Sequence, residues 1–177
     1  MKKEYIVAMA ILVLAVALYL TPVSSVIKDT SNSIEYDSMV CIYKNGEEVQ
    51  CKPNLVTNGG LNFIKDCIGQ GLCGTPTNFS IIALGNLSGG SQAATDTTLA
   101  NEWTTCGLTR SPGVYTSIGN GNWSVSKVWT ATGSCLVNTT ALFNATSSGT
   151  MFALNNFTTV SLATNDQINV TWTIWVQ

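Results

Sequence analysis

Strict alternation of apolar and polar side chains near the C-terminus is the feature that most constrains the fold. Over the nine residues from Ile168 to Val176, every second side chain is large and apolar, and those between are mostly polar. This period of two is typical of a β-strand with one buried face. Asn169, the first residue of an N-glycosylation sequon, falls on the polar face, where a glycan would reach solvent.

Strand patterns also fill most of the chain before this segment. Asn45-Gly46 between apolar runs predicts a β-hairpin over Met39–Cys51, and Gly119–Asn122 predicts a second one. The other predicted strands are Phe79–Gly85, Val114–Ile118, Trp123–Ala131, Cys135–Phe143, Thr150–Phe157, Thr159–Leu162 and Ile168–Val176. Many short strands joined by Ser-, Gly- and Asn-rich turns predict an all-β domain over residues 37–177, mainly an antiparallel β-sandwich of immunoglobulin-like or pilin-like type.

Two of these strands have a predicted core face. One face consists of Trp123, Val125, Trp129 and Ala131, interrupted by Lys127, which marks a strand end or a sheet edge. The other consists of Cys135, Val137, Ala141 and Phe143, opposite a mixed face with Leu136, Asn138, Leu142 and Asn144.

One short helix is predicted in this domain. Apolar residues recur at helical spacing from Leu61 to Ile68, with Thr57 or Asn58 as the cap and Gly69 as the end. Residues 96–103 are predicted to form a helical turn or an irregular connection.

The six cysteines predict a disulfide framework and an oxidising, extracellular compartment. Sequence alone does not choose among the pairings, but local spacing favours Cys41–Cys51, Cys67–Cys73 and Cys106–Cys135. A two-residue turn at Asn45-Gly46 would set Cys41 opposite Gln50, so the first bridge requires a longer loop or a β-bulge. A zinc site is disfavoured because the chain has no histidine and no CxxC motif.

Residues 1–25 have the layout of a secretory signal. Lys2 and Lys3 precede an apolar run over residues 5–20, and small residues precede Val26. Cleavage before Val26 and retention as a membrane anchor through residues 5–20 both stay open, because this run is close to the shortest that spans a bilayer. Either outcome places the rest of the chain outside the cytoplasm.

Charge is scarce, at 10% of the residues against a usual value of about 25%. The net charge of −2 provides no basic surface for nucleic acid. A surface with so little charge needs another source of hydration, which N-glycans would provide. Seven sequons occur in the second part of the chain, at Asn78, Asn86, Asn122, Asn138, Asn144, Asn156 and Asn169.

No pattern indicates an enzyme, a metal site or a cofactor. The lack of histidine excludes Ser-His and Cys-His dyads. Asp96 and Glu102 are neighbouring carboxylates, but their spacing suits capping and solvation better than glycoside hydrolysis. The five tryptophans are expected in the core rather than on a sugar-binding face.

Two sets of motifs carry a resemblance to a known family. The first set is NLVTNGGLNFI at residues 54–64, Ala83-Leu84-Gly85 and DTTLANE at residues 96–102; the second is residues 141–144, 149–152, 156–157, 160–162 and 166–174. These motifs resemble those of the small β-rich, tail-fibre-like surface proteins of viruses and archaea. Together they span most of residues 40–176, and they are structural motifs rather than catalytic ones. Among exported, heavily glycosylated members, the chain looks most like archaeal thread-type filaments, whose subunits donate an N-terminal strand into the next subunit. That resemblance implies a homopolymer on the archaeal cell surface.

Residues 26–36 are therefore either a stalk or a donor strand. The apolar side chains that such a strand would offer are Val26, Ile27, Ile34 and Tyr36. An incomplete sandwich invites a strand from another chain, and a contact of this kind that does not close gives a filament. We expect a structural subunit of a glycosylated extracellular filament. The alternative is a membrane-anchored or virion-associated fibre-like adhesin that does not polymerise, and an extracellular carbohydrate-active enzyme is the least favoured.

Overall fold

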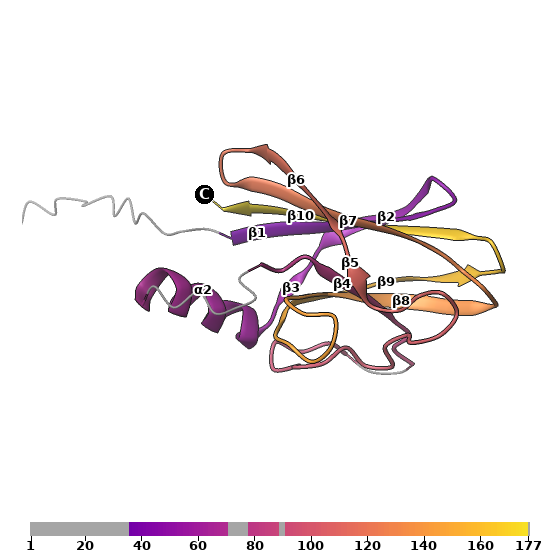
Figure 1. Cartoon of the computed structure of the whole chain (residues 1–177), viewed down its shortest axis with the longest axis horizontal. Coiled ribbons are helices and arrows are strands. Elements are labelled where there is room, and N and C mark those ends of the chain that lie inside the picture. The colour runs from indigo at the N-terminus through magenta and orange to yellow at the C-terminus, as the bar shows by residue number, and fades with distance from the viewer. Residues whose placement is uncertain (1–35, 71–77, 89–90, 177) are drawn as a thin grey trace, which may run out of the picture. The chain divides into compact units, whose positions relative to one another are not determined.

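The computed structural model describes residues 36–70, 78–88 and 91–176. The strands in these ranges form two five-stranded sheets, and every strand pairing is antiparallel. Sheet A has the order β2 (Glu47–Pro53), β1 (Tyr36–Lys44), β10 (Gln167–Val176), β7 (Asn122–Thr130), β6 (Val114–Gly119). Sheet B has the order β3 (Leu55–Val56), β9 (Met151–Leu162), β8 (Cys135–Phe143), β4 (Ile81–Gly85), β5 (Ser111–Pro112). Figure 1 shows the sheets as facing layers, which confirms the predicted all-β sandwich, whereas the predicted signal or anchor at residues 1–25 lies outside the described residues.

The main core lies between the two sheets. On sheet A, the predicted alternation of β10 is confirmed from Ile168 to Ile174, because Ile168, Val170, Trp172 and Ile174 are buried while the residues between them are partly exposed. Val176, at the end of the predicted buried face, is exposed. Apolar residues of β1, β7, β4, β8 and β9 complete the same core. A second, smaller cluster on sheet B consists of Ile81, Ala83, Leu99, Ala141, Phe143, Met151 and Leu154.

The first hairpin contains the irregularity that the Cys41–Cys51 bridge requires. Lys44 pairs with Glu47 across the Asn45-Gly46 turn, and both turn residues have positive φ, as a tight hairpin turn demands. The register then shifts between Ile42 and Tyr43, so that Val49 is an extra residue and Cys51 lies opposite Cys41. The disulfide is present.

A second irregularity corrects the predicted faces of β8. The pairing of β8 with β9 is interrupted between Val137 and Thr139, where Asn138 of β8 lies opposite residues 157–159 of β9. This irregularity breaks the side-chain alternation of β8, so that Val137 and Leu142 both join the core between the sheets, whereas Ala141 and Phe143 join the second cluster. Placing Ala141 and Phe143 on the face of Val137 was therefore wrong.

Other boundaries differ from the predictions in smaller ways. The two strands predicted over residues 150–162 are one continuous strand, β9, and the two-residue strands β3 and β5 were not predicted. Of the core face predicted around β7, Val125, Trp129 and Ala131 are buried, and Trp123 is partly buried against the same core. Pairing with β6 begins opposite Ser126, so Lys127 lies where β7 has only β10 as a neighbour.

The predicted helix, α2 (Asn58–Gln70), packs beside β9. Thr57 caps it, because its hydroxyl accepts a hydrogen bond from the backbone N–H of Gly60 at 3.1 Å. Gly60 allows a very close approach to β9, since a Cβ there would lie 2.3 Å from the carbonyl oxygen of Phe152. The helix therefore starts directly against sheet B.

Candidate functional site

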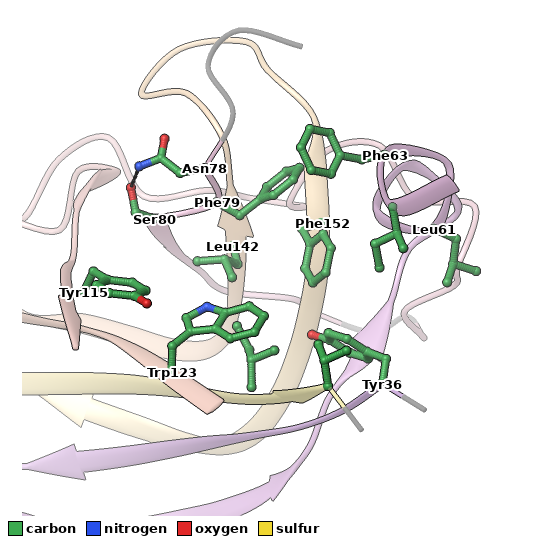
Figure 2. Close-up of a pocket in the computed structure, with 13 residues that line it drawn as sticks. Tyr36, Leu61, Phe63, Asn78, Phe79, Ser80, Tyr115, Trp123, Leu142 and Phe152 are labelled. Carbon is green, nitrogen blue, oxygen red and sulfur yellow. Dashed lines mark hydrogen bonds between the residues drawn. The ribbon is translucent and has the colours of Figure 1, made fainter. Parts of the chain in front are cut away.

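An apolar cavity of about 460 Å³ lies between the ends of the two sheets. It is lined by Tyr36, Leu61, Phe63, Ile64, Asn78, Phe79, Ser80, Tyr115, Trp123, Leu142, Phe152, Ile174 and Val176. Figure 2 shows the labelled aromatic rings converging on this space from both sheets and from α2. A volume of this size is within the range of ordinary ligand pockets, so it can hold several side chains.

The lining is built by the ends of strands and by one face of α2. Phe79 links the parts on the sheet B side: its ring centroid lies 4.7 Å from that of Phe63 on α2 and 4.8 Å from that of Phe152 on β9. Tyr36 approaches Phe152 from sheet A, with ring centroids 5.5 Å apart. Burial raises the pKa of the Tyr36 phenol. The wall is therefore aromatic and neutral, with no charged side chain in its lining.

The edge strand β6 lies beside this cavity and is exposed along its whole length. It pairs with β7 on one side only, and among the described residues no strand pairs with its outer edge. Three of its apolar side chains are largely in solvent: Val114 is 67% exposed, Tyr115 61% and Ile118 56%. An unpaired edge with exposed apolar side chains is a template for another strand.

The opposite side of the sandwich is closed by bonds from side chains to backbone. The side-chain oxygen of Gln50 on β2 accepts a hydrogen bond from the backbone N–H of Thr158 on β9 at 2.8 Å. Asn155 on β9 donates from its side-chain nitrogen to the carbonyl of Pro53 at 2.8 Å. These two bonds connect the edges of the sheets there, so β6 presents the more open edge.

The predicted donor residues are only partly described. Tyr36 is the first residue of β1, where it pairs with Val176 of the same chain. A donated strand would therefore end before Tyr36. Val26, Ile27 and Ile34 lie outside the described residues.

The sequon asparagines differ in how their side-chain amides are used. Asn78 is exposed, and its side-chain nitrogen makes one hydrogen bond, of 3.3 Å, to the hydroxyl of Ser80. Asn144 uses only its side-chain oxygen, which accepts from the N–H of Thr150 at 2.8 Å. Asn86, Asn122, Asn156 and Asn169 are partly exposed.

Asn138 is the exception, because both halves of its amide bind one backbone residue. Its oxygen accepts from the N–H of Leu87 at 2.7 Å, and its nitrogen donates to the carbonyl of Leu87 at 3.0 Å. To close this ring of two hydrogen bonds, the amide nitrogen of Asn138 donates the hydrogen that lies on the same side of its C–N bond as the amide oxygen. In a planar trans N-glycosyl amide, the sugar carbon occupies that side. The ring and a glycan on Asn138 are therefore mutually exclusive.

Two of the three predicted disulfides are confirmed, Cys41–Cys51 and Cys106–Cys135. Cys67 is also disulfide-bonded, and Cys73, its predicted partner, lies outside the described residues. The Cys106–Cys135 bridge ties the segment before β5 to the start of β8. The Cys41–Cys51 bridge, by contrast, joins directly paired residues within the β1–β2 hairpin.

The two carboxylates considered for catalysis have structural partners. Asp96 accepts a hydrogen bond from the N–H of Ala93 at 2.9 Å. Glu102 forms an ion pair with Arg110, whose guanidinium also lies 3.6 Å from the ring centroid of Phe143 and donates to the carbonyl of Ser148 at 3.0 Å. This contact, which sequence reasoning missed, ties the segment around Glu102 to the second cluster of sheet B.

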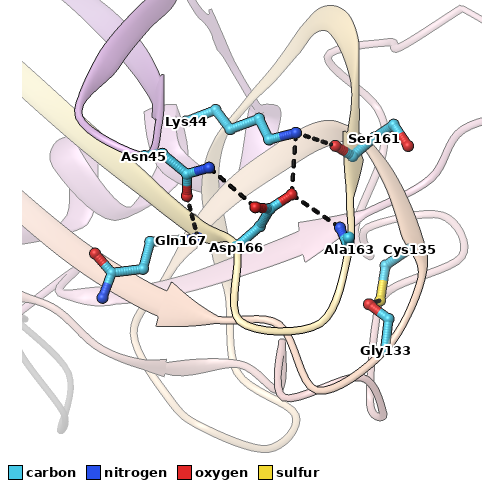
Figure 3. Close-up of polar contacts among 8 residues, drawn as sticks. All are labelled: Lys44, Asn45, Gly133, Cys135, Ser161, Ala163, Asp166 and Gln167. Carbon is cyan, nitrogen blue, oxygen red and sulfur yellow. Dashed lines mark hydrogen bonds and ion pairs between the residues drawn. The ribbon is translucent and has the colours of Figure 1, made fainter.

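A polar network at the other end of the sandwich ties the first hairpin to the β9–β10 turn (Figure 3). Asp166 accepts hydrogen bonds from the N–H of Ala163 at 2.9 Å and from the side chain of Asn45 at 2.9 Å, and it pairs with Lys44 at 3.0 Å. These bonds, first that from Ala163, lower the pKa of Asp166 to about 2.

The apolar run predicted as a signal or anchor, residues 5–20, lies outside the described residues. Within the described ranges, no helix combines the length and the apolar character needed to cross a bilayer. No protein-family model matches the chain, and no curated protein or solved structure was found to be similar to it.

Proposed function

We propose that this protein is a structural subunit of a glycosylated extracellular filament, in which a strand from one copy completes the sandwich of the next. The observation that supports this most is the apolar cavity next to the unpaired edge of β6. A donated strand needs both features, because the edge offers backbone hydrogen bonds and the cavity accepts alternate side chains.

The occupant in this proposal is the segment 26–35 of a neighbouring copy. Val26 and Ile34 share one face of an extended strand and match the uncharged apolar lining of the cavity, whereas Ile27 faces the other way. Burial of Val26 and of Ile34 would each contribute roughly 1.5–3 kcal/mol, before the entropy of ordering the segment is subtracted. The edge of β6 adds backbone hydrogen bonds to this gain.

A neighbouring copy fits better than the same chain. The chain enters β1 at Tyr36, in register with Val176, and both residues line the cavity. To fill its own cavity, the chain would have to reverse immediately before Tyr36. Ile34-Glu35 contains none of the residues that favour a tight reversal, and a turn at Ser31-Asn32-Ser33 would leave Ile34 outside the returning strand. Exchange between copies needs no such turn, and because it joins different surfaces it extends into a filament.

The proposal also includes a relationship to archaeal thread-type filaments and to pilin-like sandwiches, which rests on the sequence resemblance. It further includes an extracellular location, which the disulfides favour.

Electron microscopy of material sheared from cells, with mass spectrometry of the subunit N-terminus, tests the proposal. We expect filaments whose subunit begins near Val26. A monomer that begins at Met1 would contradict the proposal and favour the alternative, a membrane-anchored or virion-associated adhesin that does not polymerise.

A further inference from the structure

Trp175, near the end of β10, is the one tryptophan that the core of the described chain does not use. Trp129 and Trp172 are buried in that core, and Trp103 and Trp123 pack against it. Trp175 is partly exposed and belongs to neither core cluster. The expectation that the tryptophans lie in the core is therefore wrong for Trp175, whose large ring needs another explanation.

The side chain of Trp175 lies on the outer face of sheet A. Its neighbours in the chain, Ile174 and Val176, line the apolar cavity, and successive side chains of a strand point to opposite faces. The same reasoning places Asn122 on the outer face, because Trp123 beside it lines the cavity. A group attached to Asn122 therefore points away from the cavity and does not compete with a donated strand.

The strand register sets Trp175 and Asn122 directly opposite each other, between β10 and β7. At the next position in this register, the backbone N–H of Val176 donates to the carbonyl of Gly121 at 3.0 Å. Hydrogen-bonded and non-hydrogen-bonded pairs alternate along an antiparallel ladder. Trp175 and Asn122 therefore form a non-hydrogen-bonded pair, the kind in which opposite side chains come closest.

Asn122 begins a sequon, and its amide is not engaged by the fold. Neither side-chain atom makes a hydrogen bond within the described ranges, and neither is among the buried unpartnered atoms. On the side away from Trp175, Asn122 pairs with Gly119 of β6, where an added Cβ would meet nothing within 4 Å. The amide therefore has an aromatic ring on one side and open space on the other.

A second aromatic residue of this face has the same relation to a sequon. Tyr43 of β1 lies opposite Asn169 of β10, and both line a hollow of about 210 Å³. Both aromatic side chains on the outer face of the described sheet A thus lie opposite sequon asparagines. The amide oxygen of Asn169 is buried, whereas the amide of Asn122 is open. The stronger candidate for a sugar is therefore Asn122.

We propose that the first sugar of a glycan on Asn122 stacks on the indole ring of Trp175. The C–H groups on one face of a pyranose carry partial positive charge, which suits the negative face of an aromatic ring. Stacking also removes apolar surface of both rings from water. This inference rests on the glycosylated state in the proposed function, but not on filament formation.

Attachment of the glycan forms a bond between the Asn122 nitrogen and the anomeric carbon of the sugar. It breaks the bond of that carbon to the phosphate of an activated sugar donor and releases one amide proton. The stacking that follows makes and breaks no covalent bond.

The test uses the full chain, produced in a host that modifies sequons and in one that does not. Ser124→Ala removes the sequon and leaves Asn122 and Trp175 unchanged. Trp175→Thr removes the ring, and it should fold because threonine already occupies the two preceding outer-face positions of β10. Combining the two substitutions separates the effect of the glycan from that of the ring.

In the glycosylated protein, we expect Ser124→Ala to lower the melting temperature by roughly 2–6 °C, from the loss of one stacking contact. In the Trp175→Thr background, the same substitution should have no such effect, and neither background should respond in the unmodified protein. Thr146→Ala is the matched control, since it removes the sequon of Asn144, which lies opposite Thr150 and no aromatic ring. Its effect should be the same with and without Trp175.

NMR spectroscopy of the glycosylated protein provides a signature that general stabilisation would not produce. The ring current of the indole should shift C–H protons of the first sugar on Asn122 upfield. This shift should be smaller in Trp175→Phe and absent in Trp175→Thr.

Sugar protons without an upfield shift in wild type would overturn the inference, as would an equal effect of Ser124→Ala with and without Trp175. An unmodified Asn122 would also overturn it, even if filaments form. Filaments are scored separately by electron microscopy. Their absence, together with the upfield shift, would remove the filament proposal and leave the stacking site standing.

Discussion

Asn138 illustrates how a single side chain can carry a sequence motif and a conflicting structural role. Its amide ring with Leu87 holds the segment after β4 against β8, at the residue where the register of β8 shifts. In a host that modifies sequons, we expect peptide mass spectrometry to find exposed Asn78 glycosylated and Asn138 unmodified. Substantial occupancy at Asn138 would contradict the role of this ring.

The same ring gives a prediction about stability. Asn138→Asp should destabilise the domain by about 1–3 kcal/mol, because a carboxylate cannot donate to the Leu87 carbonyl. Asn86→Asp is the control, since the side chain of Asn86 makes no hydrogen bond within the described ranges. Chemical denaturation measures both, and equal effects would show that the ring contributes nothing.

Asp166 predicts how stability depends on acid. Its pKa of about 2 in the folded protein lies below the value near 3.9 expected when unfolded. The folded state therefore gains stability from the ionised carboxylate above about pH 4 and loses it as the pH falls toward 2. The melting temperature of wild type should fall more steeply between pH 4 and 2 than that of Asp166→Asn. Parallel curves for the two proteins would exclude this contribution.

At the scale of elements, β10 and both hairpins could be predicted because their signals are local. Alternation, Asn-Gly and capping residues depend only on neighbours in the chain. The faces of β8 beyond Asn138 could not, because the shift is set by pairing with β9 rather than by the sequence of β8. The irregularity before Cys51 could be predicted, because the expected disulfide requires Cys41 to lie opposite Cys51, whereas a two-residue turn alone would set it opposite Gln50.

Alanine substitutions at two glycines of α2 distinguish the close packing of the helix against β9 from its intrinsic tendency to form. Gly60→Ala should lower the melting temperature clearly, because the new Cβ would meet the Phe152 carbonyl at 2.3 Å. Gly69→Ala, in the same helix, meets nothing within 4 Å and should stabilise the protein by about 0.5–1 kcal/mol. Thermal unfolding of both variants provides the measurement. A neutral Gly60→Ala would mean that α2 does not need its close approach to β9.

At the scale of the whole molecule, the cavity could not be read from the sequence. Its lining comes from α2 and from the ends of strands far apart in the chain, such as Tyr36, Trp123 and Phe152. The distance between the two sheets at that end decides whether these side chains close on each other or leave a space. The chain's low charge and its sequons, by contrast, can be read directly from the sequence.

The filament proposal predicts a difference between two adjacent positions on α2. Leu61 lines the cavity and is 52% exposed, whereas Asn62 is exposed and is not part of the lining. Leu61→Glu should abolish polymerisation, because a donated strand would have to bury the new carboxylate. Asn62→Glu should polymerise as wild type does. Both should keep the wild-type melting temperature as monomers, and a polymerising Leu61→Glu variant would count against the cavity as the acceptor.

The most direct test of the central claim is a photo-crosslink from the cavity. A benzophenone amino acid replaces Leu61, and unlabelled copies are mixed with ¹⁵N-labelled copies before assembly. After irradiation and proteolysis, we expect mass spectrometry to find position 61 linked to peptides from residues 26–35, with mixed-isotope pairs that prove exchange between copies. Links only between peptides of the same isotope, or no link to residues 26–35, would contradict the claim that a neighbouring copy fills the cavity.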